Sequence, residues 1–410
     1  MNTKNIFFVI IGLIYINYSC NKTKLSDEGT LPVINLTIDD KYLWSIDSGL
    51  YIETNYREKW EFPAEIQYFE NNVQIFRDKV GFRIKGNASR GSSMKSFGIY
   101  WKKKYGPAKL NYKMFPDIPV NQYKRLFLRN SGNDFGETHI KDGSITMIFK
   151  DFANVDYQSY KPSVLYLNNS YWGIYNIREM LTRHYFESHY NVNGDAVDLL
   201  YGSELHPRAD DGMVDDFVQD VIKFINENDL SITANFDILK SRIDVDSYMD
   251  YVIINTYIAN TDWPIGNSKW WRDKTSISNT KWRWIVYDTD WSLKGEGNIE
   301  KVWIGELFSN HERKDREDGL YLFNKMIKNK EFIDEFLDRY LFFINTVFED
   351  KRVENIINNN KNRIKTEYDN HQKKWNTLSM YQWGNDIDEM IEFNRKRNVV
   401  MKKIITKLKE

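Results

Sequence analysis

The sequence is poor in cysteine, in net charge and in clustered histidine. A single cysteine, Cys20, stands among 410 residues, so no disulfide can form within the chain. The 57 basic side chains nearly match the 58 acidic ones, so no global field draws the chain to nucleic acid or to an anionic membrane. We therefore expect no nucleic-acid partner. The six histidines show no metal-ligand spacing and give no support to a histidine-based metal centre.

Long apolar runs are also missing, except at the N-terminus. Residues 6–16 form an apolar run that follows a basic start and is too short to span a bilayer. Residues 1–19 therefore predict a lipoprotein signal peptide, with Cys20 as the lipidated residue. A strict lipobox would carry Leu where this chain has Asn17, so a plain secretory signal with an incidental cysteine is the alternative.

Lipidation of Cys20 has consequences for the rest of the chain. We expect residues 20–30 to be a polar tether and the protein to be anchored to the membrane, in the cell envelope and outside the cytoplasm. The mature body then has no thiolate left for catalysis or for binding zinc.

The chain has ample apolar surface to bury, since 41% of its residues are hydrophobic and 15% are aromatic. This composition predicts one large domain or two fused lobes. Alternation predicts strands and helical periodicity predicts helices. The expected strands span residues 31–37, 62–69, 80–84, 96–101, 125–128, 163–167, 173–177 and 282–287, and the expected helices span residues 143–152, 183–190, 215–226, 246–259 and most of the chain after 321.

The order of these elements predicts an α+β fold of two lobes, β-rich in its N-terminal part and α-rich in its C-terminal part. We expect the main domain at residues 31–310 and a helical C-terminal part at residues 311–410 that packs on the same domain. Asp246 is expected to cap the helix at residues 246–259.

The residues that suggest chemistry lie in one loop and at the end of one strand. Asp262 and Asn267 are five positions apart after a predicted helix, and the predicted strand at 281–287 ends in Asp288 and Asp290. Phosphoryl transfer uses a carboxylate to orient the accepting hydroxyl, and an amide with a second carboxylate to hold Mg²⁺. The spacing alone is weak, because it also occurs by chance. Asp288 and Asp290 are expected to point to opposite sides of an extended chain, so that only one of them binds metal.

A set of motifs resembles the CotH (spore coat protein H) kinase family, and together they cover roughly residues 31–310. These motifs lie at residues 31–34, 49–52, 81–86, 89–91, 95–97, 128–134, 171–179, 260–263 and 282–290. The family's usual Arg-Asp helix start is present only loosely, as Lys141-Asp142. The resemblance implies an atypical kinase-like fold that binds ATP and Mg²⁺ or Mn²⁺ in a cleft between two lobes.

The resemblance also implies roles for the acidic residues. Asp262 would be the catalytic aspartate. Asn267 would bind the metal together with Asp288 or Asp290, and the sequence does not decide between these two.

Further roles fall on the N-terminal part. Arg83, Lys85 and Ser89 would lie in a turn that covers the phosphates, Lys95 is the preferred phosphate lysine and Glu179 would pair with it. A simpler interpretation stays open for each of them: Arg83 and Lys85 also fit a solvated strand face, and Lys95 also fits a strand end.

Two functions of different classes follow from these observations. The first is an enzyme, an atypical kinase that transfers phosphate from ATP to Ser or Thr hydroxyls of secreted or surface proteins. The second is a non-catalytic binding or structural protein that keeps the kinase-like fold outside the cytoplasm, where ATP is scarce, and binds an envelope partner. An acid–base hydrolase is a third class, but no nucleophile or water-activating partner is evident.

Overall fold

The computed structural model describes residues 31–275, 280–301 and 319–410. The predicted signal peptide at residues 1–19, the tether with Cys20 and the expected boundary at residue 310 lie outside the described residues. No helix in the described ranges combines the length and apolarity needed to cross a membrane.

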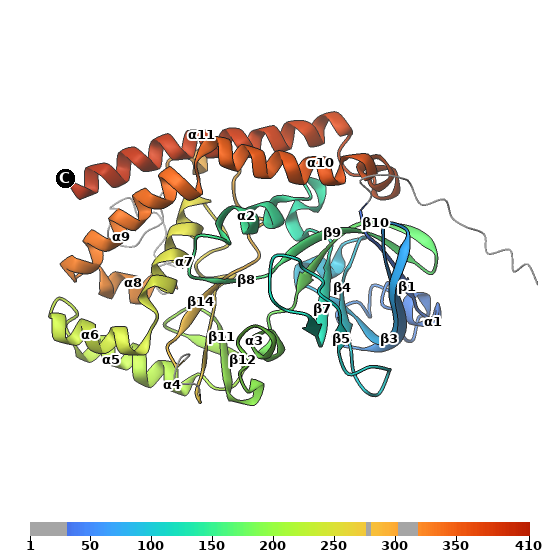
Figure 1. Ribbon diagram of the computed structural model, residues 1–410, viewed down its shortest axis with the longest axis horizontal. Coiled ribbons are helices and arrows are strands. Elements are labelled where there is room, and N and C mark those ends of the chain that lie inside the picture. The colour runs from blue at the N-terminus through green and yellow to red at the C-terminus, as the bar shows by residue number, and fades with distance from the viewer. Residues whose placement is uncertain (1–30, 276–279, 302–318) are drawn as a thin grey trace, which may run out of the picture.

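The expected α+β fold is confirmed: a β-rich N-terminal part adjoins a second part in which helices dominate (Figure 1). The N-terminal part is a barrel. Seven of the described strands close it in the order β1-β2-β3-β4-β7-β10-β9, and the parallel pair of β1 and β9 completes the ring. The barrel strands are β1 (Val33–Thr37), β2 (Phe62–Glu70), β3 (Val73–Lys85), β4 (Ser96–Tyr100), β7 (Arg125–Arg129), β9 (Tyr160–Leu167) and β10 (Ser170–Glu179). A small ribbon of β5 (Leu110–Asn111) and β6 (Gln122–Tyr123) lies beside them.

Side-chain alternation decides what the barrel strands present on each face. On β3, Phe82 and Ile84 are fully buried in the barrel core, so Arg83 and Lys85 point outward. The predicted hairpin of β9 and β10 turns at Asn168 and Asn169, both left-handed with φ of 50° and 60°. Asparagine tolerates this conformation in tight hairpin turns.

The second part contains a sheet that the sequence did not predict, apart from its strand near residues 282–287. Its described strands run in the order β12-β11-β13-β14-β8. These are β8 (Asp156–Tyr157), β11 (Val197–Gly202), β12 (Pro207–Asp211), β13 (Lys269–Asp273) and β14 (Arg283–Val286). β11 and β14 are almost entirely buried, so they lack the polar–apolar alternation that reveals a half-exposed strand.

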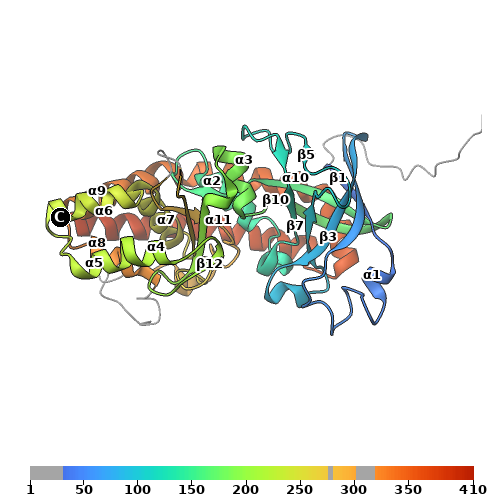
Figure 2. The same ribbon diagram turned by 90° about the horizontal axis from the view of Figure 1, so that it is seen from below.

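Helices surround this sheet and extend along the whole molecule. The helices are α1 (Lys41–Trp44), α2 (Lys141–Phe149), α3 (Arg183–Tyr190), α4 (Asp215–Phe217), α5 (Phe224–Glu227), α6 (Thr233–Arg242), α7 (Val245–Tyr257), α8 (Tyr321–Met326), α9 (Lys330–Phe342), α10 (Asp350–Trp375) and α11 (Met380–Lys409). α10 and α11 lie side by side along the barrel and the helical part (Figures 1 and 2), and α10 contacts β10.

The expectation that Asp246 caps α7 is wrong, because Asp244 accepts the hydrogen bond from the Ser247 backbone at 3.0 Å.

Two large cores stabilise these parts. One fills the barrel. The other joins α7 and the second sheet to α8–α11, with Trp284, Phe336 and Ile405 all fully buried. The C-terminal helices therefore share one hydrophobic core with the sheet that carries the candidate site.

Candidate active site

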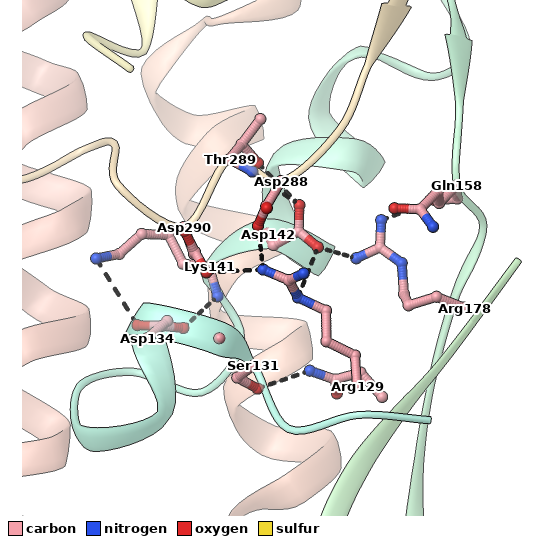
Figure 3. A network of polar contacts seen from close by, with 12 residues as sticks. Arg129, Ser131, Asp134, Lys141, Asp142, Gln158, Arg178, Asp288, Thr289 and Asp290 are labelled. Carbon is pink, nitrogen blue, oxygen red and sulfur yellow. Dashed lines mark hydrogen bonds and ion pairs between the residues drawn. The ribbon is translucent and has the colours of Figure 1, made fainter. Parts of the chain in front are cut away.

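The end of β14 brings two carboxylates to one guanidinium. The Nη2 of Arg129, on β7, donates to Asp288 and, at 2.7 Å, to Asp290. Asp288 lies beyond the end of the strand and is left-handed, with φ of 55°. Because the chain turns there instead of staying extended, the two carboxylates converge, and the expectation that they point to opposite sides is wrong (Figure 3).

Asp290 is the buried member of this pair. Its carboxylate also accepts hydrogen bonds from the backbone of Asn133 at 2.8 Å and from the Asn133 side chain at 3.3 Å. Burial raises the pKa of Asp290 to about 7, although Arg129 opposes this shift. Asp290 is thus a strongly desolvated carboxylate in need of positive charge.

The loop at residues 262–267 lies against the end of β14. The side-chain amide of Asn267 donates to the backbone oxygen of Asp288 at 3.0 Å and lies 3.5 Å from Oδ2 of Asp262. The Gly266 amide donates to the Asp262 backbone oxygen at 2.9 Å, which closes the turn. Asp262 itself is exposed. The structure therefore brings together the four acidic and amide residues predicted from the sequence.

Asp142, at the start of α2, joins this site to the barrel. It accepts hydrogen bonds from Arg178 on β10 and, at 3.1 Å each, from the backbone and hydroxyl of Thr289. The Nε of Arg129 lies 3.7 Å from the same carboxylate. Arg178 and Arg129 hold the pKa of Asp142 below its usual value against the opposing effect of burial. One carboxylate thus fixes two barrel arginines and the residue between the acidic pair (Figure 3).

A second buried pair stands beside it. Lys141 lies 3.7 Å from Asp134 and 2.7 Å from Glu137, although its side chain is almost completely buried. The motif that matched the family only loosely, Lys141-Asp142, therefore places both residues in the polar network. No role was assigned from the sequence to Arg129, Asp134, Lys141 or Asp142. The family motif at residues 128–134 contains the first two and could have pointed to them.

The outward face of β3 carries positive charge toward the second sheet. Burial, with Arg83 and Arg90 nearby, lowers the pKa of Lys85 to about 8. Lys269 of β13 and Asp210 of β12 also act on Lys85, and these two form an ion pair. Three cations and one carboxylate therefore act on Lys85, and among the described residues the buried Nε of Arg83 has no hydrogen-bond partner.

The turn after β3 has a defined shape. Gly86 adopts φ of 110°, and a Cβ there would lie 2.3 Å from the hydroxyl of Ser89. Arg90 donates to the Gly86 carbonyl at 2.7 Å and to the Arg57 carbonyl at 2.8 Å. Ser89 and Arg90 thus lie in a compact turn beside Lys85, and only glycine fits at its start.

Lys95 does not show the contacts that were expected of it. Its ammonium donates to the backbone oxygens of Arg90 at 2.5 Å and Ser92 at 3.2 Å, and it lies over the rings of Tyr51 and Tyr56. These bonds stabilise the turn. They give no support to the expectation that Lys95 faces the phosphates.

The expected pair of Lys95 with Glu179 is wrong. Glu179 bonds to the ring of His189 at 2.6 Å and to the backbone of Ser159 at 3.1 Å. The strand register explains this result. Leu126 of β7 pairs with Glu179 on one side and with Ile99, near the end of β4, on the other. Lys95 precedes the start of β4, so it lies at the opposite end of that strand from Glu179.

The donor set at the end of β14 fits a divalent cation of the expected kind. Asn267, Asp288 and Asp290 offer amide and carboxylate oxygens, which Mg²⁺ and Mn²⁺ take as ligands. Within the part of the chain that the structure describes, no group of three or more His, Cys, Asp or Glu side chains forms a metal site. A cation held by Asn267, Asp288 and Asp290 would need further ligands, such as phosphate oxygens and water.

Comparison with known proteins identifies the family to which the chain is similar. The family model described as CotH kinase protein matches residues 82–401. The match extends through the C-terminal helices, beyond the motifs recognised in the sequence, and includes every residue of the candidate site named above except Tyr51, Tyr56 and Arg57. A comparison with curated proteins finds no match.

Proposed function

Because this chain belongs to the CotH kinase protein family, we propose that it transfers the terminal phosphoryl group of ATP to a Ser or Thr hydroxyl of a secreted or surface protein. The observation that carries this proposal is the convergence of Asp262, Asn267, Asp288 and Asp290 at the end of β14. Phosphoryl transfer depends mainly on positioning and on charge stabilisation, which such an arrangement supplies.

Asp262 would orient the hydroxyl that accepts the phosphoryl group. Its side chain is exposed, and its Oδ2 lies 3.5 Å from the amide of Asn267, which also bonds to the backbone of Asp288. The hydroxyl oxygen forms a bond to the terminal phosphorus as the bond to the ADP oxygen breaks, and the hydroxyl proton passes to Asp262.

Asn267, Asp288 and Asp290 would hold Mg²⁺ or Mn²⁺, which neutralises charge on the ATP phosphates. The two aspartates lie in different environments. Asp290 is fixed by two bonds from Asn133, whereas the backbone of Asp288 is fixed by Asn267 and its carboxylate is partly exposed.

The phosphates would lie along the outward face of β3. Arg83 and Lys85 point there, and the turn with Ser89 is next to them. The lowered pKa of Lys85 reports repulsion from neighbouring cations as well as burial, and a bound anion would relieve that repulsion. Of the two candidate lysines, these contacts favour Lys85 over Lys95.

The substrate class depends on location. A lipid on Cys20 would hold the catalytic body at the membrane, outside the cytoplasm, and a protein of the envelope or cell surface would be within reach. Membrane fractionation tests this part separately: the native protein should be found with membranes and Cys20→Ser should be released.

One observation favours the second candidate, a non-catalytic binding protein. Arg129 already bridges the two acidic side chains, and ATP is scarce outside the cytoplasm. A protein of this kind would keep the ion-pair network as a structural element and bind an envelope partner elsewhere.

Nucleotide titration separates the two. In the kinase case, ATP raises the melting temperature of the purified protein only when Mg²⁺ or Mn²⁺ is present. Asp262→Asn should keep this shift and lose phosphoryl transfer at least about 100-fold, because it removes the group that orients the hydroxyl. The exposed Asp369→Asn on α10 is the matched control and should retain both properties. The absence of any metal-dependent ATP shift would contradict the kinase proposal and favour the binding protein.

A further inference from the structure

The guanidinium of Arg129 occupies the position between the two acidic side chains. Its Nη2 is shared by Asp288 and Asp290, and its Nε lies near Asp142. The side chain of Arg129 is 10% exposed, that of Asp290 is 1% exposed and that of Asp288 is 33% exposed. A buried cation thus stands at the point where a divalent ion bound by both carboxylates would have to lie.

Arg129 and such an ion cannot both hold the two carboxylates. A carboxylate pair that converges on one point needs positive charge there, and the arginine supplies one unit of it without any ligand. A divalent ion would bring two units, but it would meet the repulsion of a guanidinium that cannot lose its proton. Entry of the ion therefore requires the arginine to give up one partner.

Asp288 is the partner that can be released. It lies at the solvent edge in a turn, whereas Asp290 is buried with hydrogen bonds from Asn133. Arg129 would also keep the attraction of Asp142 behind it. Breaking the partly exposed bond between Arg129 and Asp288 costs less free energy than breaking the buried bond between Arg129 and Asp290.

We propose that Arg129 is a place-holding cation of this site, and that a divalent ion binds only when it displaces the Arg129 guanidinium from Asp288. This inference rests on the proposed function, in which Asp288 is a metal ligand. Binding of metal is then coupled to a rearrangement between β7 of the barrel and the end of β14. Until a divalent ion arrives, Arg129 stays paired with both carboxylates. Arg129 in this role is a positioning residue.

The test measures Mn²⁺ affinity in the absence of nucleotide, by calorimetry and by the Mn²⁺-dependent shift in melting temperature. Arg129→Gln and Arg129→Met both remove the competing charge, whereas a lysine would keep it, because one ammonium can make the two contacts that Nη2 makes. Both variants should bind Mn²⁺ at least about tenfold more tightly than the native protein. Circular dichroism establishes that each variant is folded, and the methionine variant serves where the glutamine variant is not.

The matched control is Arg178→Gln, which removes another buried guanidinium from Asp142 but touches neither Asp288 nor Asp290. It should lose stability without any gain in Mn²⁺ affinity. Equal or weaker Mn²⁺ binding in the folded Arg129 variants would overturn the place-holding role. If Asp288→Asn binds Mn²⁺ as tightly as the native protein does, Asp288 is not a metal ligand. That result would overturn the metal site of the proposed function, and this inference with it.

Discussion

Arg129 and Asp290 lie 161 positions apart in the sequence, and Nη2 of Arg129 donates to Oδ2 of Asp290 at 2.7 Å in a buried site. This bond joins the last residue of β7 in the barrel to the turn that follows β14 in the second sheet. The candidate site is therefore built across the junction of the two parts.

Gly132 makes this contact possible, and its replacement should be damaging. It adopts φ of 61°, and a Cβ there would lie 2.2 Å from Oδ2 of Asp290 and 2.6 Å from Nη2 of Arg129. We expect Gly132→Ala to lower the free energy of unfolding by about 1–3 kcal/mol and to weaken metal-dependent ATP binding. Gly136→Ala, in the same short helix but with no atom within 4 Å of the added Cβ, should behave like the native protein. Equal effects of the two variants, in urea unfolding and ATP titration, would contradict this account.

Lys85 and Lys95 should differ in what their loss removes. Lys85→Met takes a cation from the face of β3, so we expect the Kd for ATP to rise about tenfold or more with little loss of stability. Lys95→Met breaks two hydrogen bonds to the turn, so we expect a loss of stability of about 1–3 kcal/mol. Thermal unfolding with and without ATP measures both. A larger ATP defect in the Lys95 variant would restore Lys95 as the phosphate lysine.

Glu204 should make the protein less stable at alkaline pH. Its carboxyl group is buried near α8, and burial raises its pKa to about 8 although it accepts a hydrogen bond from the Leu322 amide at 2.8 Å. From pH 4.5 to pH 8 the unfolded chain loses this proton and the folded protein keeps it, so stability falls as pH rises. Relative to the native protein, Glu204→Gln should gain up to about 4 kcal/mol at pH 9 and far less at pH 5. Urea unfolding at both pH values measures this, with the exposed Glu53→Gln as the unaffected control.

His371 should make the protein less stable at acidic pH. Its buried Nδ1 accepts the Ile174 amide at 3.0 Å, and burial beside His139 holds its pKa well below the ordinary value. Below about pH 6.5 the unfolded chain takes up a proton that the folded protein refuses, so stability is complete above this pH and falls as pH decreases. His371→Gln should reduce the loss of stability between pH 7 and pH 5 by about 2 kcal/mol. The exposed His206→Gln should leave that loss unchanged, and an identical pH slope in the His371 variant would refute the assignment.

Local sequence was enough to find the acidic part of the site. Asp262 and Asn267 belong to one turn, and Asp288 and Asp290 flank one residue at the end of a predicted strand. Contacts of this kind span few residues, so their pattern survives in the linear sequence. The convergence of Asp288 and Asp290 was missed because a left-handed residue reversed the alternation expected of a strand.

The basic part of the site could not be predicted in the same way. Alternation shows that Arg83 and Lys85 share one face of β3, but only closure of the barrel shows that this face looks toward the second sheet. The pairing of Lys95 with Glu179 could not be tested in the sequence either, since strand register places the two residues at opposite ends of β4.

The sequence by itself determined the barrel strands, most of the helices, the acidic loop and the resemblance to a kinase family, because each depends on neighbouring residues or short motifs. Only the tertiary structure decided that Arg129 bridges the acidic pair and that Lys95 bonds to the turn while Glu179 bonds to His189. The physical reason is that charges interact through space: burial and strand register set their distances, and neither is written in the order of residues along the chain.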